Sequence, residues 1–218
     1  MKNNLMKKNL QILIADDHTL VRDGLINTIS KGMQDVTFGE ASSAADVLKE
    51  IRNKRWDLLI LDINMPGRDG LDVLRELNTL QPDLPVIILS MYPEDQYAVR
   101  TLKMGASAYL TKETSAQELI AAIHTVLAGQ KHLTSSITRI LAEEITGKQA
   151  NPTHETLSNR EFQVLKLIAS GKNISGIALE LSLSVKTISV YRSNILQKLS
   201  LKNNAEITNY AFKNNLTD

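Results

Sequence analysis

The chain has 218 residues, a length that suits one large domain or two small ones. Apolar residues make up 43% of the sequence and charged residues 22%, close to the values of ordinary globular proteins, which excludes a disordered or fibrous chain. The absence of cysteine excludes disulfide bonds, a thiolate nucleophile and cysteine-ligated metal sites, and it favours the reducing cytoplasm as the compartment.

The charge of the chain changes sign along its length. Residues 1–150 carry 17 basic and 19 acidic side chains, whereas residues 151–218 carry 8 basic and 5 acidic ones, so the net charges are −2 and +3. A mildly basic C-terminal part is compatible with a nucleic-acid partner. The basic N-terminus is followed by no apolar segment, and no run approaches ~18 apolar residues, so neither export nor a membrane partner is expected.

Five short apolar runs in the first 110 residues are predicted to be strands, and they cover residues 12–15, 36–38, 58–61, 86–89 and 108–110. Stretches with helical spacing separate these runs, and a last helix is predicted from Ala116 to Leu127, ended by Gly129. Because the strands are apolar throughout, both faces of their sheet should be covered. Residues 8–129 are therefore predicted to form a doubly wound α/β domain with a parallel five-stranded sheet.

The rest of the chain is predicted to contain no strands. Residues 130–154 have weak periodicity and read as a linker, with a short helix near residues 136–145. Residues 155–218 have helical spacing throughout and are predicted to form a small all-α domain. Two of its helix starts are marked by capping residues, Ser158 with Glu161 and Asn203 with Glu206.

Acidic side chains follow two of the predicted strands. Asp16 and Asp17 come directly after the first strand, and Asp62 follows the third. The carboxyl ends of parallel strands meet at one edge of the sheet, where ligands of such folds bind. Clustered carboxylates repel one another unless they bind a cation, and a small site lined by oxygen atoms suits Mg²⁺. The sequence therefore predicts a magnesium site at this edge.

Two further polar residues are predicted at the same edge, Ser90 at the end of the fourth strand and Lys112 just past the fifth. Acids, Mg²⁺, a hydroxyl and an ammonium group together are suited to phosphoryl chemistry, in which a carboxylate can accept the phosphoryl group. Asp62 is the best acceptor candidate, because the Pro and Gly residues of the segment that follows it predict a tight turn that leaves the carboxylate accessible.

The motifs ADDH at residues 15–18, LDINMPGRDGL at 61–71, ILSMY at 88–92 and GASAYLTK at 105–112 resemble the receiver domain of bacterial two-component response regulators. The resemblance implies the strand order 2-1-3-4-5. It also assigns roles: Asp62 is the phosphoacceptor, Ser90 and Lys112 sense the phosphate, and Tyr109 is the switch residue whose ring moves inward. The implied Mg²⁺ ligands are Asp17, Asp62 and the Asn64 carbonyl, with Asp16 bound through water or placed behind the direct ligands.

In the C-terminal part, a predicted helix that begins at Ile174 is followed by a break at residues 181–184 and a second helix with apolar positions at Ile188, Ile195 and Leu199. This spacing is typical of a helix-turn-helix, with Ser184 as the N-cap of the second helix. The outer face of that helix is expected to approach base edges and phosphates. The predicted DNA-contacting residues are Lys186, Thr187, Ser189, Val190, Arg192, Ser193 and Lys198.

Residues 157–203 resemble the LuxR-type helix-turn-helix of the NarL/FixJ family of response regulators. The resemblance implies that the second helix binds duplex DNA and that the last helix pairs two chains. Ile207, Tyr210 and Ala211 share one face of that last helix and are the predicted dimerisation residues. The implied partners are a sensor histidine kinase or phosphotransfer protein, a second copy when phosphorylated, and promoter DNA. RNA polymerase is a further partner that the resemblance allows.

The predicted function is that of a cytoplasmic transcriptional regulator, not an enzyme, whose dimerisation and DNA binding are controlled by phosphorylation of Asp62. Two alternatives remain open on the sequence. The first is a Mg²⁺-dependent phosphohydrolase with an aspartyl-phosphate intermediate, although such enzymes have a second Asp two residues after the nucleophile, where this chain has Asn64. The second is a receiver whose helical domain binds a protein, which salt-insensitive binding would indicate.

Overall fold

The computed structural model describes residues 9–65, 70–145, 153–214 and 216. The chain divides into two units, residues 1–142 and residues 143–218, and each is described by itself.

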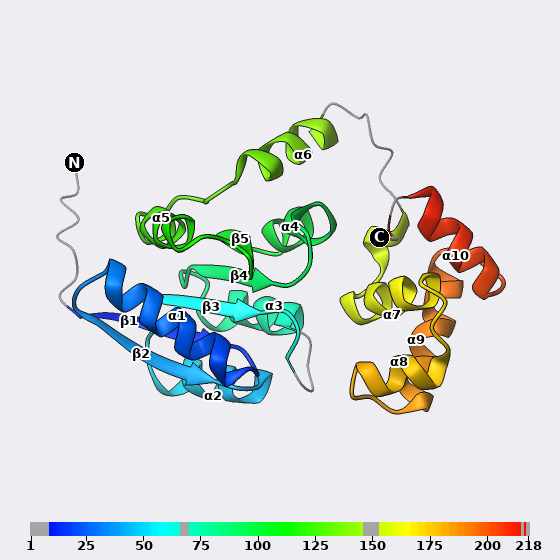
Figure 1. Cartoon of the computed structure of the whole chain (residues 1–218), viewed down its shortest axis with the longest axis horizontal. Coiled ribbons are helices and arrows are strands. Elements are labelled where there is room, and N and C mark those ends of the chain that lie inside the picture. Colours follow the sequence, from blue (N-terminus) through cyan, green and yellow to red (C-terminus); the bar gives the residue numbers. More distant parts are fainter. Residues whose placement is uncertain (1–8, 66–69, 146–152, 215, 217–218) are drawn as a thin grey trace. The chain divides into compact units, whose positions relative to one another are not determined.

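The first unit contains a parallel sheet of five strands, which appear as arrows in Figure 1. The strands are β1 (Leu10–Ala15), β2 (Val36–Ala41), β3 (Leu58–Asp62), β4 (Val86–Ser90) and β5 (Ala108–Thr111). Their order is β2-β1-β3-β4-β5, so the fold class and the implied strand order are both confirmed. Every residue of β3 and β4 is buried, because these apolar strands lie inside the sheet and are covered on both faces.

Five helices connect and cover the strands: α1 (Thr19–Gly32), α2 (Ala44–Asn53), α3 (Gly70–Leu80), α4 (Glu94–Lys103) and α5 (Ala116–Leu127). Helices α1 and α5 lie against each other and share a core cluster with the side chains on one face of the sheet. Helices α2 and α3 contact each other and bury their own apolar residues. The helix α5 has the predicted bounds, and Gly129 after it has a φ of +80°, which glycine tolerates at a helix end.

The segment that follows α5 is held on the first unit. The His132 backbone N–H donates to the Ser107 carbonyl over 2.9 Å, and Ile137 is fully buried. Ile137 belongs to helix α6 (Ser135–Ile145), which matches the short helix predicted within the linker. Residues 146–152 of the predicted linker lie outside the described residues.

The second unit is helical, as predicted. Its elements are the 3-10 turn η1 (Thr153–Thr156) and the helices α7 (Asn159–Ala169), α8 (Ile174–Glu180), α9 (Val185–Lys198) and α10 (Asn204–Lys213). Between α8 and α9 the chain bends by 112°, a value within the range of helix-turn-helix motifs. Ser182 in the turn has a φ of +53°, which lets the chain reverse within four residues.

Side-chain caps begin these helices where the sequence predicted them. Ser158 and Glu161 form a capping box at α7, and Asn203 accepts from the Glu206 N–H at α10. Ser184 accepts from the Thr187 N–H at α9. In the described parts of the chain, no helix is both long and apolar enough to cross a membrane.

Candidate functional site

The predicted carboxylate cluster forms at the carboxyl edge of the sheet. Asp16 directly follows β1 and Asp62 ends the neighbouring strand β3, and both side chains are almost completely buried. Lys112 follows β5, and its Nζ lies 2.6 Å from Asp16 Oδ2 and 2.7 Å from Asp62 Oδ2. One ammonium group is therefore shared by two carboxylates that are 46 residues apart in the chain, as the strand topology predicts.

Two carboxyl groups and one ammonium group lie together at this poorly solvated edge. Burial raises the pKa of Asp62, and the hydrogen bonds from Lys112 and from the Asn64 N–H oppose that rise. Burial alone would lower the pKa of Lys112, but its hydrogen bonds to Asp16 and Asp62 outweigh burial and raise it. Lys112 is therefore held as a cation, and its hydrogen bond to Asp62 opposes the effect of burial on that carboxyl.

Asp17 and His18 complete a group of three side chains that could hold a metal ion. One ligand atom from each of Asp16, Asp17 and His18 lies within 4.8 Å of the others. His18 Nδ1 is 2.8 Å from Asp17 Oδ1, and the His18 N–H donates to Asp16 Oδ1 over 2.9 Å. Carboxylate oxygens from Asp16 and Asp17, close to Asp62, are the hard ligands that Mg²⁺ prefers, so the donor set fits this ion. His18 was not among the predicted ligands.

Asn64, the remaining predicted ligand, contacts Asp62 through its backbone. Its N–H donates to Asp62 Oδ1 over 3.0 Å, so each oxygen of the Asp62 carboxylate has a donor, Asn64 on one and Lys112 on the other. The carboxylate is thereby held in one orientation. The Pro and Gly residues that predicted a tight turn occupy residues 66–69, which lie outside the described residues.

A glycine lies directly behind the Asp62 backbone. The Gly70 N–H donates to the Ile63 carbonyl over 3.1 Å, at the start of α3. A Cβ at Gly70 would lie 2.5 Å from the Asp62 carbonyl oxygen and 2.8 Å from the Ile63 Cα, closer than atoms can approach. Glycine at this position is therefore what lets α3 begin against the end of β3.

Ser90 at the end of β4 and Tyr109 of β5 both contact Tyr92, which lies in the loop after β4. The fully buried Ser90 hydroxyl accepts from the Tyr92 N–H over 3.1 Å, and the Tyr109 hydroxyl donates to the Tyr92 carbonyl over 2.8 Å. The Tyr109 ring is fully buried, and burial raises the pKa of its hydroxyl. The predicted sensor and switch residues are therefore both hydrogen-bonded to the backbone of one residue, Tyr92, which the sequence analysis did not single out.

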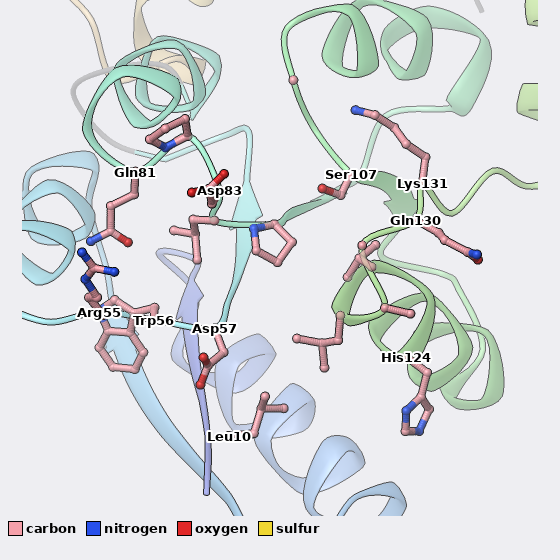
Figure 2. A pocket seen from close by; sticks show the side chains of 18 of the residues that line it. Leu10, Arg55, Trp56, Asp57, Gln81, Asp83, Ser107, His124, Gln130 and Lys131 are labelled. Atoms are coloured by element: carbon pink, nitrogen blue, oxygen red, sulfur yellow. The ribbon is translucent and has the colours of Figure 1, made fainter. Parts of the chain in front are cut away.

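A pocket with a volume of about 900 Å³ lies at the opposite edge of the sheet (Figure 2). Its lining includes residues that precede strands, such as Asp57 before β3 and Ser107 before β5. Several of its polar groups are bonded within the protein: Asp57 accepts from the Gln11 N–H, and Lys131 donates to the Ala106 carbonyl. None of the predicted site residues lines this pocket.

In the second unit, α9 presents the side chains predicted to contact DNA. Ile188 and Ile195 are fully buried, and Lys186, Ser189 and Ser193 are exposed. Val190 is 52% exposed. Thr187 and Arg192 are half-buried. The Thr187 hydroxyl pairs with the capping Ser184 hydroxyl, and Arg192 Nε donates to Asn204 Oδ1.

The structure gives Lys198 a role different from the predicted one. Its Nζ lies 2.6 Å from Oε2 of Glu161, a carboxylate that is only 3% exposed and that also closes the capping box of α7. The predicted phosphate contact therefore competes with an internal partner, because an almost buried carboxylate needs its counter-ion. We leave Lys198 out of the proposed DNA-contacting residues.

We expect Glu161→Gln to lower the stability of the second unit while keeping the α7 cap, because glutamine also closes a capping box. The loss should be about 1 kcal/mol, since the Lys198 side chain is 39% exposed. Burial raises the pKa of Glu161, but the Lys198 and Ser158 hydrogen bonds outweigh it and lower the pKa. The ion pair therefore stabilises the wild type above the ordinary glutamate pKa and is lost as the pH falls through the lowered value.

The measurement is denaturant unfolding, followed by far-UV circular dichroism, of both proteins between pH 3 and pH 7. The difference in unfolding free energy should shrink toward acid pH. A difference that stays constant across this range would contradict the role of the Glu161 charge.

The structure argues against two of the three predicted dimerisation residues. Ile207 and Ala211 are fully buried inside the second unit, where α10 packs against α7. Tyr210 is half-buried, and its hydroxyl accepts from the His154 N–H over 3.0 Å. The apolar stripe of α10 is therefore its attachment to the core. Phe212 is the large apolar side chain that α10 exposes, with 75% of its surface accessible.

Sequence reasoning also missed a contact between Glu94 at the start of α4 and Thr134 just before α6. A partial signal was present. A threonine immediately before a predicted helix is a candidate N-cap, and the Ile137 N–H does donate to the Thr134 hydroxyl over 3.2 Å. No sequence spacing indicates its second partner, which is 40 residues away.

Comparison with known families matches most of the chain. Residues 12–124 match the model of the response regulator receiver domain, and residues 155–211 match that of the bacterial regulatory proteins of the luxR family. The two matches coincide with the two parts that carry the carboxylate cluster and the helix-turn-helix.

Similar proteins match this chain over almost its whole length. The response regulator GacA of Pseudomonas aeruginosa is 34% identical over 212 residues, which cover 96% of this chain and 98% of GacA. The oxygen regulatory protein NreC of Staphylococcus carnosus is 34% identical and covers 96% of this chain and 100% of its own. RcsB of Salmonella enterica serovar Typhimurium, solved bound to the rprA promoter with the phosphomimetic BeF3⁻, has a TM-score of 0.62 at 26% identity and covers 93% of this chain and 98% of its own.

Proposed function

Since the chain belongs to the two-component response regulators that join a receiver domain to a LuxR-type DNA-binding domain, we propose that transfer of a phosphoryl group to Asp62 controls how it binds promoter DNA. The observation that carries this proposal is the Lys112 ammonium shared by Asp16 and Asp62 at the carboxyl edge of the sheet. This arrangement places an anionic nucleophile beside a fixed cation in a poorly solvated pocket.

The Asp62 carboxylate is the nucleophile. Its orientation is fixed by the Asn64 N–H on one oxygen and Lys112 on the other, so an oxygen can be presented to an incoming phosphorus atom. Lys112 opposes the rise in the pKa of Asp62 that burial causes, and its ammonium group can contact the phosphoryl oxygens as they gain charge. Asp16 and Asp17, with Asp62 and Asn64, would hold Mg²⁺, which neutralises phosphoryl charge when bound.

Ser90 and Tyr109 supply the response. A phosphoryl group adds three acceptor oxygens, and the Ser90 hydroxyl can donate to one of them. This hydroxyl now accepts from the Tyr92 N–H, and the Tyr109 hydroxyl donates to the Tyr92 carbonyl. A rotation of Ser90 toward the phosphate therefore changes the residue that Tyr109 holds, and the loop between β4 and α4 is the two-state element of the switch.

The second unit supplies the output through α9. Its exposed outer face fits the major groove, with Val190 able to contact a thymine methyl group and the serines able to approach base edges. The start of α9 after Ser184 offers backbone N–H groups to a phosphate. Lys186 and Arg192 are the cations of this surface that we assign to DNA phosphates.

We expect Lys186→Ala and Arg192→Ala each to weaken DNA binding on all sequences and to reduce the slope of log K against log salt by about 1, because each removes one phosphate contact. Fluorescence anisotropy with a labelled duplex at several salt concentrations measures the slope. Lys31→Ala, which removes an exposed charge from α1 of the first unit, is the matched control. If neither α9 variant changes the slope of log K against log salt, this face of α9 does not contact DNA. Binding that does not depend on salt would favour a protein target for the helical domain.

We assign pairing of two phosphorylated chains to the exposed face of α10 around Phe212, in place of the buried residues predicted from the sequence. The phosphoryl donor is a sensor histidine kinase or a phosphotransfer protein, and RNA polymerase is the further partner at a promoter. The compartment of such a regulator is the cytoplasm.

Genomic footprinting with and without beryllofluoride or acetyl phosphate tests the proposed function. Protection of discrete promoter sites that strengthens with the phosphodonor is the expected result. Uniform protection that the donor does not change would contradict it. The hydrolase alternative has no support from this family, and turnover of phosphate esters by the purified protein would be needed to revive it.

A further inference from the structure

Thr134 has two hydrogen-bond roles at the start of α6. Its hydroxyl accepts from the Ile137 N–H over 3.2 Å, and its carbonyl accepts from the Thr138 N–H, so Thr134 is the N-cap of this helix. The same hydroxyl donates its proton to Glu94 Oε2 over 2.9 Å. One side chain therefore both begins α6 and binds it to α4.

Glu94 is the first residue of α4 and lies four residues after Ser90. The residues between them are bound to the predicted sensor and switch: the Tyr92 N–H donates to Ser90, and the Tyr92 carbonyl accepts from Tyr109. The Tyr92 ring stacks on Tyr97 of α4, with 4.7 Å between ring centroids. A displacement of this loop therefore reaches Glu94 directly through the chain.

The segment before Thr134 is fixed at a different place. His132 Nε2 lies 2.7 Å from Glu118 Oε1 on α5, and the His132 N–H donates to the Ser107 carbonyl. These contacts lie on α5 and at the start of β5, away from the Ser90 loop. The chain from His132 to α6 is thus anchored outside the switch at His132, and its bond to Glu94 attaches it to the switch.

We propose that the Glu94–Thr134 hydrogen bond is a regulatory latch that transmits the state of the Ser90 loop to α6 and hence to the linker. The latch rests on the proposed function of the same site. When Ser90 turns to a phosphoryl oxygen it gives up the Tyr92 N–H, the loop moves, and Glu94 moves with it. Thr134 then loses its carboxylate partner, and α6 is held less tightly on the first unit.

Hydrogen–deuterium exchange of the full chain tests the latch, followed in peptides that cover residues 134–142, with and without Mg²⁺ and beryllofluoride. In the wild type, beryllofluoride should speed exchange by about fivefold, the equivalent of one hydrogen bond. Glu94→Ala removes the latch and keeps the Thr134 cap. Without beryllofluoride, this variant should exchange as fast as the wild type does with beryllofluoride, and adding beryllofluoride should not change its rate. Thr134→Ser keeps both bonds and is the matched control.

Peptides that contain Ser90 show in the same experiment whether beryllofluoride binds. If they become protected while residues 134–142 exchange unchanged in the wild type, or if Glu94→Ala behaves like the wild type, the latch is overturned and the proposed function stands. If the Ser90 peptides do not respond at all, the proposed function is overturned. If residues 134–142 still exchange faster in Glu94→Ala in that case, the hydrogen bond holds α6 in place but does not regulate it, which also overturns the latch.

Discussion

Asp62→Asn is expected to reduce phosphoryl incorporation from acetyl phosphate to background. The variant keeps the shape of the side chain but replaces the carboxylate with an amide, which cannot form an acyl phosphate. The amide has a single oxygen, which can still accept from the Asn64 N–H, and Lys112 keeps Asp16 as its partner, so the fold around the site should persist. Radiolabelled acetyl phosphate with Mg²⁺, followed by gel separation, measures the incorporation.

The matched control is Asp83→Asn, which removes an exposed carboxylate in the segment that precedes β4, at the opposite edge of the sheet. This variant should be labelled like the wild type. Labelling of Asp62→Asn at the wild-type level would place the acceptor elsewhere and remove the basis of the proposed function. The DNA response of Asp62→Asn to beryllofluoride should be lost together with the labelling, because both depend on the same carboxylate.

Ile207→Ala is expected to destabilise the second unit by about 2–5 kcal/mol, the cost of removing a buried isoleucine side chain from a core. Ile207 has no exposed surface and lies where α10 packs against α7. Chemical unfolding separates the two units, because Trp56, the single tryptophan, lies in the first unit. Far-UV circular dichroism should show an earlier transition of the helical unit, while the Trp56 fluorescence transition stays in place.

Phe212→Ala is compared with Ile207→Ala to decide which of these two residues of α10 stabilises the core and which pairs two chains. Phe212 is 75% exposed, so its loss should change the unfolding free energy by less than about 0.5 kcal/mol. Sedimentation of the beryllofluoride-treated protein should show weaker dimerisation. Unchanged stability in Ile207→Ala with a lost dimer would restore the pairing face predicted from the sequence.

The fold was predictable because its signals are local. The apolar runs of the buried strands, the helical spacing between them and the caps at Ser158 and Ser184 each lie within a few residues. The carboxylate cluster was also predictable, since parallel strands bring their ends to one edge whatever their separation in sequence. Asp16, Asp62 and Lys112 needed no further information to be brought together.

What could not be predicted depends on which surfaces meet. The stripe of α10 that contains Ile207 is apolar whether it faces α7 or a second chain, so periodicity alone could not choose between them. Lys198 was expected to contact DNA, but its partner Glu161 lies 37 residues earlier and becomes visible only when α7 and α9 pack. The Glu94–Thr134 contact was missed for the same reason.

Gly70 shows that the chemistry of this receiver also depends on a residue with no functional group. Any larger residue there would press on the backbone that carries Asp62, although every acid, hydroxyl and amine of the cluster would still be encoded. Natural relatives that retain all the reactive side chains but have lost this glycine should therefore be regarded as candidates for silent receivers, and an inventory of the reactive residues alone would misclassify them.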